Sequence, residues 1–168
     1  ANHRTSAHDI ALMSRELLKN HPDIKKFTTI WMDTVRNGAF GLSNTNKMIR
    51  FYNGATGLKT GFTSGAGYCL SASAQREGME LIAVVMGSET SAHRFNTCKG
   101  MLDYGFANFA LVTADTEQSL EVPVKLGKMS VATAEPAERP QLLVDKSQKS
   151  LVTTQVTLEE SVAAPVSR

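Results

Sequence analysis

Gly57-Leu58-Lys59-Thr60-Gly61-Phe62 opens the stretch of sequence that decides the fold. Two more strand-like segments follow it, at residues 67–74 and 79–86, and a glycine-containing turn separates each segment from the next. Connections this short join antiparallel neighbours, because two parallel strands need a long crossover between them. We therefore predict three neighbouring antiparallel strands, with the Lys-Thr-Gly tripeptide on the first of them.

A helix is expected before these strands. Ser6 and Asp9 form a capping signature, in which a hydroxyl residue is followed three positions later by an acid. Apolar residues then recur at helical spacing at Ile10, Met13 and Leu17. The residue before Pro22 is pushed out of the helical region, so the predicted helix covers residues 7–19.

A second helix is expected after the strands, over residues 91–109, with Ser91 as its N-cap. The apolar residues expected on one side of this helix are Phe95, Cys98, Met101 and Leu102. We expect this helix to close the domain that the three strands begin.

The segment between the first helix and the strands is less regular. We expect a short helical turn at residues 23–27, with Lys25 and Lys26 on a solvated face. Strand-forming residues follow at 28–35, and residues 37–53 are dominated by Gly, Asn, Ser and Thr, which favour turns. The sequence therefore predicts mostly turns just before the Lys-Thr-Gly strand.

The composition changes in the last third of the chain. Short alternating segments at residues 120–124, 141–144 and 152–158 are separated by Pro, Gly, Lys and Glu, a pattern typical of short strands. We therefore divide the chain into a first domain at residues 1–112 and a partial, β-rich domain at residues 113–168.

Composition excludes several classes of function. The 168 residues are 42% hydrophobic and 20% charged, as in globular proteins, and the net charge of +2 gives no reason to expect nucleic acid as a partner. The longest apolar run, residues 81–86, is far shorter than the roughly 20 residues of a membrane helix. The first residues contain neither an initiator Met nor a secretory signal pattern, which we interpret as the start of a processed or truncated chain.

Cysteines and histidines do not indicate a metal or cofactor site. We expect Cys69 and Cys98 to be two free, partly buried thiols, and a disulfide between them is the alternative. No ligand spacing relates the four histidines, which are His3, His8, His21 and His93. We therefore expect no metal and no cofactor.

Catalytic character is confined to the segment Thr56-Gly57-Leu58-Lys59-Thr60-Gly61, which ends in the Lys-Thr-Gly tripeptide. A lysine on a strand can place a positive charge beside a nucleophile and beside a substrate carboxylate. A threonine hydroxyl can add a hydrogen bond to the same anion, and such charge-assisted bonds are each worth about 1.5–3 kcal/mol. A glycine leaves room for a substrate backbone to lie against the strand. An exposed strand lysine beside a turn is the alternative interpretation.

The stretch from Asn53 to Gly87 resembles the low-molecular-mass D-alanyl-D-alanine carboxypeptidases, which are serine-type penicillin-binding proteins. The features that match are Ser6-Ala7-x-Asp9, Asn44-Thr45-Asn46, Gly57-Leu58-Lys59-Thr60-Gly61, Ala66-Gly67-Tyr68, Ser73-Ala74, Leu81-Ile82, Val85-Met86-Gly87, Arg94 and Tyr104-Gly105-Phe106. The resemblance covers residues 3–110, and the remainder is similar to the small β-rich C-terminal domain of the family. It implies an α+β fold: part of a β-lactamase/transpeptidase-like domain, with an antiparallel sheet and flanking helices, followed by a partial all-β domain.

The resemblance also implies roles for individual residues. Lys59 would bind the substrate and support proton transfer, and Thr60 and Gly61 would line the carboxylate and strand-docking site. The backbone N–H of Phe62 would be one of two donors to the oxyanion, although some members carry histidine at this position, which affects the expected substrate preference. Arg94 matches an arginine that helps to hold the terminal carboxylate of D-alanine, and a solvated arginine at the start of a helix is the alternative.

Two motifs of the family are not found in these 168 residues. No serine has a lysine three positions later, and none has an asparagine two positions later. The resemblance implies that the nucleophilic Ser-x-x-Lys and the Ser-x-Asn motif lie in polypeptide upstream of residue 1. The chain alone is therefore expected to be inactive and poorly stable, because a face of its sheet would lack its covering layer.

The implied partners are a peptidoglycan stem peptide ending in D-Ala-D-Ala and the β-lactam antibiotics, at an extracytoplasmic location. Membrane association would come only through segments absent from this sequence. Two alternatives stay open: a β-lactamase, which shares the Lys-Thr-Gly motif and the fold, and a non-catalytic module that binds the cell wall through the β-rich domain.

Overall fold

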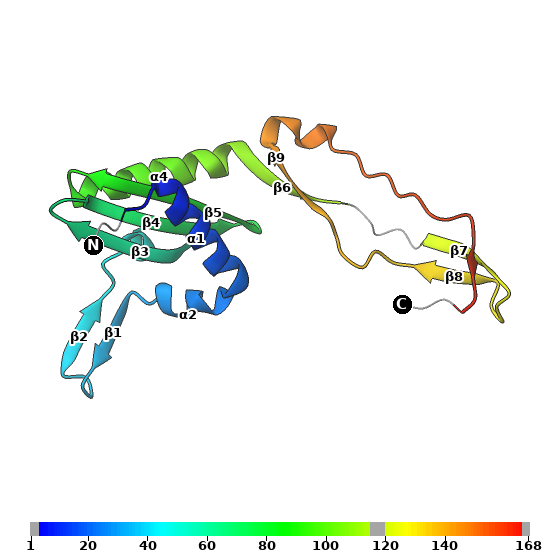
Figure 1. Ribbon diagram of the computed structural model, residues 1–168, viewed down its shortest axis with the longest axis horizontal. Coiled ribbons are helices and arrows are strands. Elements are labelled where there is room, and N and C mark those ends of the chain that lie inside the picture. Colours follow the sequence, from blue (N-terminus) through cyan, green and yellow to red (C-terminus); the bar gives the residue numbers. More distant parts are fainter. Residues whose placement is uncertain (1–3, 115–119, 166–168) are drawn as a thin grey trace. The chain divides into compact units, whose positions relative to one another are not determined.

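The computed structural model describes residues 4–114 and 120–165, and the chain divides into two compact units (Figure 1). The first unit is Ala1–Asn108 and the second is Phe109–Arg168. The division falls slightly before the boundary expected between residues 112 and 113, at the point where the last helix of the first unit ends.

The centre of the first unit is an antiparallel sheet in the order β3-β4-β5. Its strands are β3 (Ala55–Thr63), β4 (Gly67–Arg76) and β5 (Met79–Ser88). The prediction of three antiparallel strands is confirmed. In the described residues β3 is an edge strand, so the Lys-Thr-Gly tripeptide lies at the border of the sheet.

Helix α1 (Ala7–Asn20) begins at the predicted capping box. The Ser6 side chain accepts a hydrogen bond from the Asp9 backbone N–H, and the Asp9 carboxylate accepts one from the Ser6 backbone N–H. The Ser6 hydroxyl also donates to the Asp9 carboxylate at 2.8 Å, and this bond, with the one from the Ser6 backbone N–H, lowers the pKa of the Asp9 carboxyl below its usual value. The helix is joined to the sheet by a buried contact of 2.7 Å between the hydroxyls of Ser14 and Ser71.

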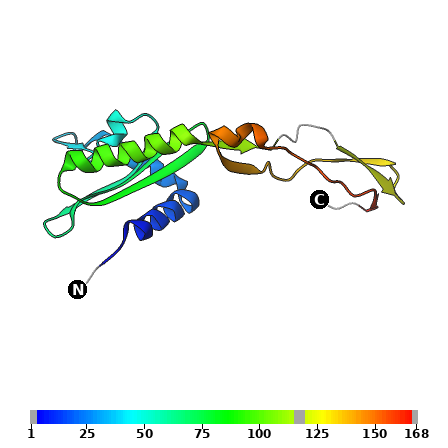
Figure 2. The same cartoon turned by 90° about the horizontal axis from the view of Figure 1, so that it is seen from above.

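Helix α4 (Ser91–Asn108) covers the face of the sheet opposite α1 (Figure 2). Its buried residues are Arg94, Cys98, Leu102, Gly105 and Phe106. The expectation that Met101 belongs to this side is wrong, since its side chain is 42% exposed. The buried stripe follows the spacing of four and seven residues from Cys98, and this leaves Met101 on the flank.

The N-cap of α4 also differs from the prediction. The backbone N–H of His93 donates to the Thr90 hydroxyl at 3.1 Å, so Thr90 caps the helix, one residue before the expected Ser91. The Ser91 hydroxyl instead accepts a long bond of 3.4 Å from the Arg94 guanidinium. Both residues have hydroxyl side chains, and the sequence pattern did not distinguish them.

More regular structure lies between α1 and β3 than the composition suggested. The elements are η1 (Pro22–Ile24), α2 (Lys25–Thr28), β1 (Met32–Val35), β2 (Phe40–Ser43) and α3 (Met48–Phe51). The predicted turn at 23–27 is confirmed as η1 and α2, but residues 37–53 contain a strand and a helical turn instead of turns alone. The turn-forming residues occupy the β1–β2 connection, where Arg36, Asn37 and Gly38 have positive φ.

The second unit contains two small sheets. Strand β6 (Phe109–Thr113) pairs antiparallel with β9 (Gln141–Asp145), and η2 (Lys146–Leu151) follows β9. In the other sheet β7 (Leu120–Lys125) lies between β8 (Val131–Ala134) and β10 (Val162–Ala163). The strands predicted at 120–124 and 141–144 are confirmed. The strand predicted at 152–158 is not formed, because this segment pairs with no other strand among the described residues.

Candidate active site

Lys59, Thr60 and Gly61 lie in the middle of β3. Lys59 pairs with Ser71 across the sheet, and Gly61 pairs with Cys69. Directly opposed residues of antiparallel strands point to the same face, and Ser71 contacts α1, so the Lys59 side chain belongs to the α1 face. Lys59 is exposed, and its ammonium donates to the Thr60 carbonyl oxygen at 2.7 Å.

A cavity of about 500 Å³ lies between α1 and this face of the sheet. Its polar border includes Lys59, Thr60, Ser14 and Ser71. Its apolar lining is contributed by Ile10, Met13, Leu17, Leu58, Leu70, Val84, Val85 and Met86. The Lys59 side chain therefore lies beside this cavity and is not packed among other side chains.

Gly61 has no packing reason to be a glycine. A Cβ built at this position would meet only the Cβ of Cys69, at 3.8 Å, which is ordinary van der Waals contact. The position is exposed, so the missing side chain leaves open space along the strand. Such space suits the close approach of another backbone.

The hydroxyl of Thr60 contacts a residue far from it in the sequence. Its Oγ1 lies 2.6 Å from Oγ1 of Thr45. The neighbouring Asn46 is almost completely buried and donates from its side-chain amide to the Gly57 carbonyl at 2.9 Å. The segment at residues 44–46 thus holds β3 at two points, one before the tripeptide and one within it.

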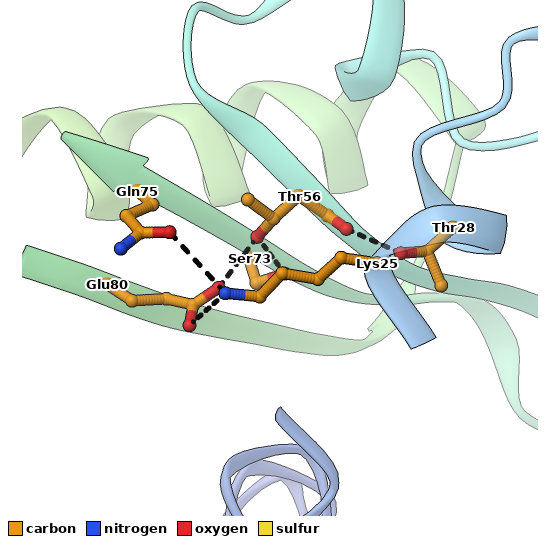
Figure 3. Close-up of polar contacts among 6 residues, drawn as sticks. All are labelled: Lys25, Thr28, Thr56, Ser73, Gln75 and Glu80. Atoms are coloured by element: carbon orange, nitrogen blue, oxygen red, sulfur yellow. Dashed lines mark hydrogen bonds and ion pairs between the residues drawn. The ribbon is translucent and has the colours of Figure 1, made fainter. Parts of the chain in front are cut away.

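A second set of polar contacts, the Lys25–Glu80 cluster, connects α2 with all three strands (Figure 3). Glu80 accepts from the Lys25 ammonium at 2.8 Å through one oxygen and from the Thr56 hydroxyl at 2.9 Å through the other. The Thr56 hydroxyl also lies 2.8 Å from the hydroxyl of the buried Ser73, and the Thr28 hydroxyl donates to the Thr56 carbonyl at 2.6 Å. These contacts secure β3 where its pairing with β4 is irregular, between Ala55 and Gly57.

The expectation of a solvated face at Lys25 and Lys26 is wrong for the first of them. The Lys25 side chain is 25% exposed and its partner Glu80 is 22% exposed, whereas the Lys26 pair with Asp23 is at the surface. Glu80 lies on β5, so adjacent sequence could not reveal this partner.

We predict that Glu80→Gln lowers the free energy of unfolding by about 1–3 kcal/mol, because it leaves the half-buried Lys25 ammonium without its carboxylate. The matched control is Asp23→Asn, which removes the exposed partner of Lys26 and should change stability by about 0.5 kcal/mol or less. Denaturant unfolding of the two variants measures the difference. Equal effects would show that the cluster adds no more than a surface ion pair.

Arg94 approaches the tripeptide from α4. One of its terminal nitrogens donates to the Gly61 carbonyl at 3.0 Å and to the Cys69 carbonyl at 3.1 Å. The residue is only 6% exposed, so the alternative of a solvated arginine is wrong. Its guanidinium lies over the rings of Tyr68 and Phe95, and in the described part of the chain its Nε has no hydrogen-bond partner. The arginine therefore carries a positive charge to the backbone of the candidate site, and its contact with a substrate carboxylate stays a prediction.

Phe62 extends the site along β3. Its ring is 58% exposed and lies 4.3 Å from the ring of Tyr68 on β4, measured between centroids. This aromatic pair borders the strand just after Gly61. The role expected for the Phe62 backbone N–H stays a prediction.

Both cysteines are free, as predicted. Cys69 is half-buried on β4, and Cys98 is buried under the sheet on α4. Burial raises the pKa of the Cys98 thiol to about 12, so this thiol is neutral at physiological pH. Residues 4–114 and 120–165 contain no group of three or more His, Cys, Asp or Glu that could hold a metal ion; His3 lies outside these residues.

Comparison with known proteins identifies the family. The family model described as D-alanyl-D-alanine carboxypeptidase matches residues 1–90, which is more than half of the 168 residues. The chain belongs to the D-alanyl-D-alanine carboxypeptidase family. A curated relative in this family, D-alanyl-D-alanine carboxypeptidase DacF of Bacillus subtilis, is 35% identical over 172 aligned positions, which include 99% of this chain and 44% of DacF.

Solved structures of penicillin-binding proteins share the fold. Penicillin-binding protein 5 from Haemophilus influenzae matches with a TM-score of 0.69 and 28% identity, over 98% of this chain and 48% of that chain. Penicillin-binding protein D2 from Listeria monocytogenes, solved with bound cefotaxime, matches with a TM-score of 0.53 and 36% identity, over 56% of this chain and 38% of that one. The chain thus spans less than half of the length of each of these family members. The predicted α+β fold, with an antiparallel sheet flanked by helices, is confirmed.

Local sequence patterns do not reveal the residues that hold the Lys-Thr-Gly strand in place. Asn44-Thr45-Asn46 stands out in the sequence only as a feature that matches the family. Thr28 and Glu80 lie in segments predicted as strands, and nothing in the sequence indicates their contacts with Thr56; Thr28 is in fact the last residue of α2. A concentration of hydroxyl and amide residues shortly before the strand was the available signal. Their partners on β3 could be recognised only once the chain was folded.

Proposed function

We propose that this chain supplies the Lys-Thr-Gly side of the active site of a serine-type D-Ala-D-Ala carboxypeptidase. The Ser-x-x-Lys and Ser-x-Asn motifs would be contributed by polypeptide outside these 168 residues. The observation that carries the proposal is the exposed ammonium of Lys59 beside a cavity of about 500 Å³, on an edge strand whose next residues are Thr60 and Gly61. Membership of the carboxypeptidase family supports it.

In the proposed reaction, the serine oxygen forms a bond to the carbonyl carbon of the penultimate D-alanine of a peptidoglycan stem peptide. The amide C–N bond breaks, and the terminal D-alanine leaves with a proton on its amine. Water then hydrolyses the ester and restores the serine hydroxyl. Lys59 and Thr60 would hold the terminal carboxylate, Arg94 would add positive charge from the α4 side, and the Phe62 N–H would donate to the oxyanion.

Lys59 and Gly61 have complementary roles in this proposal. The ammonium and the Thr60 hydroxyl would bind the carboxylate through charge-assisted hydrogen bonds. Gly61 would let the peptide lie against β3, as an extended ligand adds to an exposed sheet edge. The open space at Gly61, which the protein's own packing does not use, supports this arrangement.

The same site is proposed to react with β-lactams, and cefotaxime bound to the Listeria protein supports this. Residues 1–112 would be the C-terminal part of the peptidase domain, and residues 113–168 part of the β-rich C-terminal domain. Because the substrate is peptidoglycan, the location would be extracytoplasmic. No helix among the described residues has both the length and the apolar character needed to cross a membrane.

The test uses the polypeptide that carries both this chain and the Ser-x-x-Lys serine. We expect covalent labelling by a fluorescent penicillin and release of one D-alanine from a peptide ending in D-Ala-D-Ala. Rapid turnover of the penicillin without lasting label would favour the β-lactamase alternative. Binding to cell-wall sacculi without labelling or D-alanine release would favour the non-catalytic module, and either result would contradict the proposal.

A further inference from the structure

We propose that Thr45 is a positioning residue, which orients the Thr60 hydroxyl toward the carboxylate of the substrate. This inference rests on the proposed function, and it concerns a residue outside the Lys-Thr-Gly tripeptide. It begins with the distance of 2.6 Å between the Oγ1 atoms of Thr45 and Thr60, either of which could be the donor. The two residues are separated by 15 positions in the sequence.

The number of protons decides the direction of this hydrogen bond when an anion is bound. Each threonine hydroxyl has one proton to donate and two lone pairs that accept. A carboxylate can only accept, so the Thr60 proton must point to it. The Thr60 oxygen is then free to accept the Thr45 proton, and a chain forms from Thr45 to Thr60 to the carboxylate. Each bond in such a chain polarises the next and strengthens it.

Thr45 is held between two anchored asparagines. The Asn44 side-chain amide donates to the carbonyls of Ile30 at 3.0 Å and Thr28 at 3.2 Å. The Asn46 amide donates to the Gly57 carbonyl at 2.9 Å, and this residue is 1% exposed. The backbone N–H of Asn46 also donates to the Asn44 side-chain oxygen at 2.9 Å, which closes a tight turn around Thr45. The Thr45 backbone is therefore fixed relative to β3 without help from its own side chain.

Thr28 links this turn to the Lys25–Glu80 cluster. Its carbonyl accepts from Asn44, and its hydroxyl donates to the Thr56 carbonyl, the contact drawn in Figure 3. Both the turn and the tripeptide strand are thus held by the same residue of α2. Loss of the Thr45 hydroxyl should therefore free the Thr60 hydroxyl to rotate, while the hydrogen bonds made by Asn44, Asn46 and Thr28 stay in place.

The consequence is selectivity for a negatively charged ligand. If Thr45 orients Thr60 toward a carboxylate, a variant without the Thr45 hydroxyl should react more slowly with ligands that carry the carboxylate. It should react normally with ligands in which the carboxylate is esterified. A purely structural role would slow both reactions by the same factor.

The experiment measures acylation rate constants for benzylpenicillin and for its methyl ester, in the polypeptide that also carries the Ser-x-x-Lys serine. For Thr45→Val we expect a rate about three- to ten-fold lower with the acid, the range for one lost hydrogen bond, and a change below about two-fold with the ester. Thr45→Ser keeps the hydroxyl and should restore the wild-type ratio of the two rates. Thr34→Val, at an exposed threonine of β1, is the matched control and should leave both rates unchanged.

The ratio of acid rate to ester rate does not depend on how much protein is folded. Thr45→Ala serves as a second variant without the hydroxyl if Thr45→Val folds poorly. An unchanged ratio in both variants, or a ratio that Thr45→Ser does not restore, would overturn the inference and leave the proposed function intact. Wild-type protein that benzylpenicillin does not acylate would overturn the proposed function, and this inference with it.

Discussion

Lys59→Ala should reduce acylation by penicillin by at least about 100-fold, in the polypeptide that carries this chain and the Ser-x-x-Lys serine. The substitution removes the ammonium that would bind the ligand carboxylate, a contact worth about 1.5–3 kcal/mol. It also removes the positive charge that would support proton transfer at the serine. The two losses act on the same transition state, so labelling should fall below detection on the time scale of the wild-type reaction.

The measurement is the second-order rate constant of covalent labelling, followed by fluorescence of the separated protein. Lys26→Ala is the matched control, because Lys26 is also exposed in the first unit but forms a surface pair with Asp23. Its labelling should match wild type. Lys59→Arg keeps the charge with a different shape and should label at an intermediate rate. Full labelling of Lys59→Ala would remove the role given to this residue.

Leu102→Ala should destabilise the first unit by about 2–5 kcal/mol, the usual cost of a cavity in a packed core. Leu102 is 1% exposed on the side of α4 that covers the sheet. The surrounding helix and strands are hydrogen-bonded and can collapse only partly into the space left by the side chain. The expected result is a clear fall in the midpoint of thermal or denaturant unfolding.

The neighbouring Met101 provides the control. Its side chain is 42% exposed, so Met101→Ala should cost about 1 kcal/mol or less, without a cavity term. Circular dichroism of both variants during unfolding gives the comparison. Similar losses of stability, or a larger loss for Met101→Ala, would mean that α4 is rotated about its axis, so that Met101 faces the sheet as much as Leu102 does.

Local patterns predicted the elements whose signals lie within a few residues. The Ser6–Asp9 capping box defined the start of α1, since both partners of its hydrogen bonds are three positions apart. Short turns made β3, β4 and β5 antiparallel neighbours. The prediction of a strand at 152–158 is wrong because a strand needs a neighbouring strand to pair with. An alternating sequence alone does not provide that partner.

The residues of the candidate site also fall into those that the sequence reveals and those that only the structure reveals. Lys59, Thr60 and Gly61 could be recognised in the sequence, because the chemistry of a cation, a hydroxyl and a bare backbone is contained in three consecutive residues. Arg94 was recognised through family resemblance alone. Its burial against the Gly61 and Cys69 carbonyls became visible only in the structure.

The amino-acid order alone established the family resemblance, the three strands and the Lys-Thr-Gly chemistry, since each depends on residues that are close together in the sequence. Tertiary structure decided which polar groups meet: Lys25 with Glu80, Asn46 with Gly57, and Thr45 with Thr60. A hydroxyl, amide or ammonium has many chemically equivalent partners along a chain. Burial and the geometry of packing select one of them, and that selection holds the Lys-Thr-Gly strand in position.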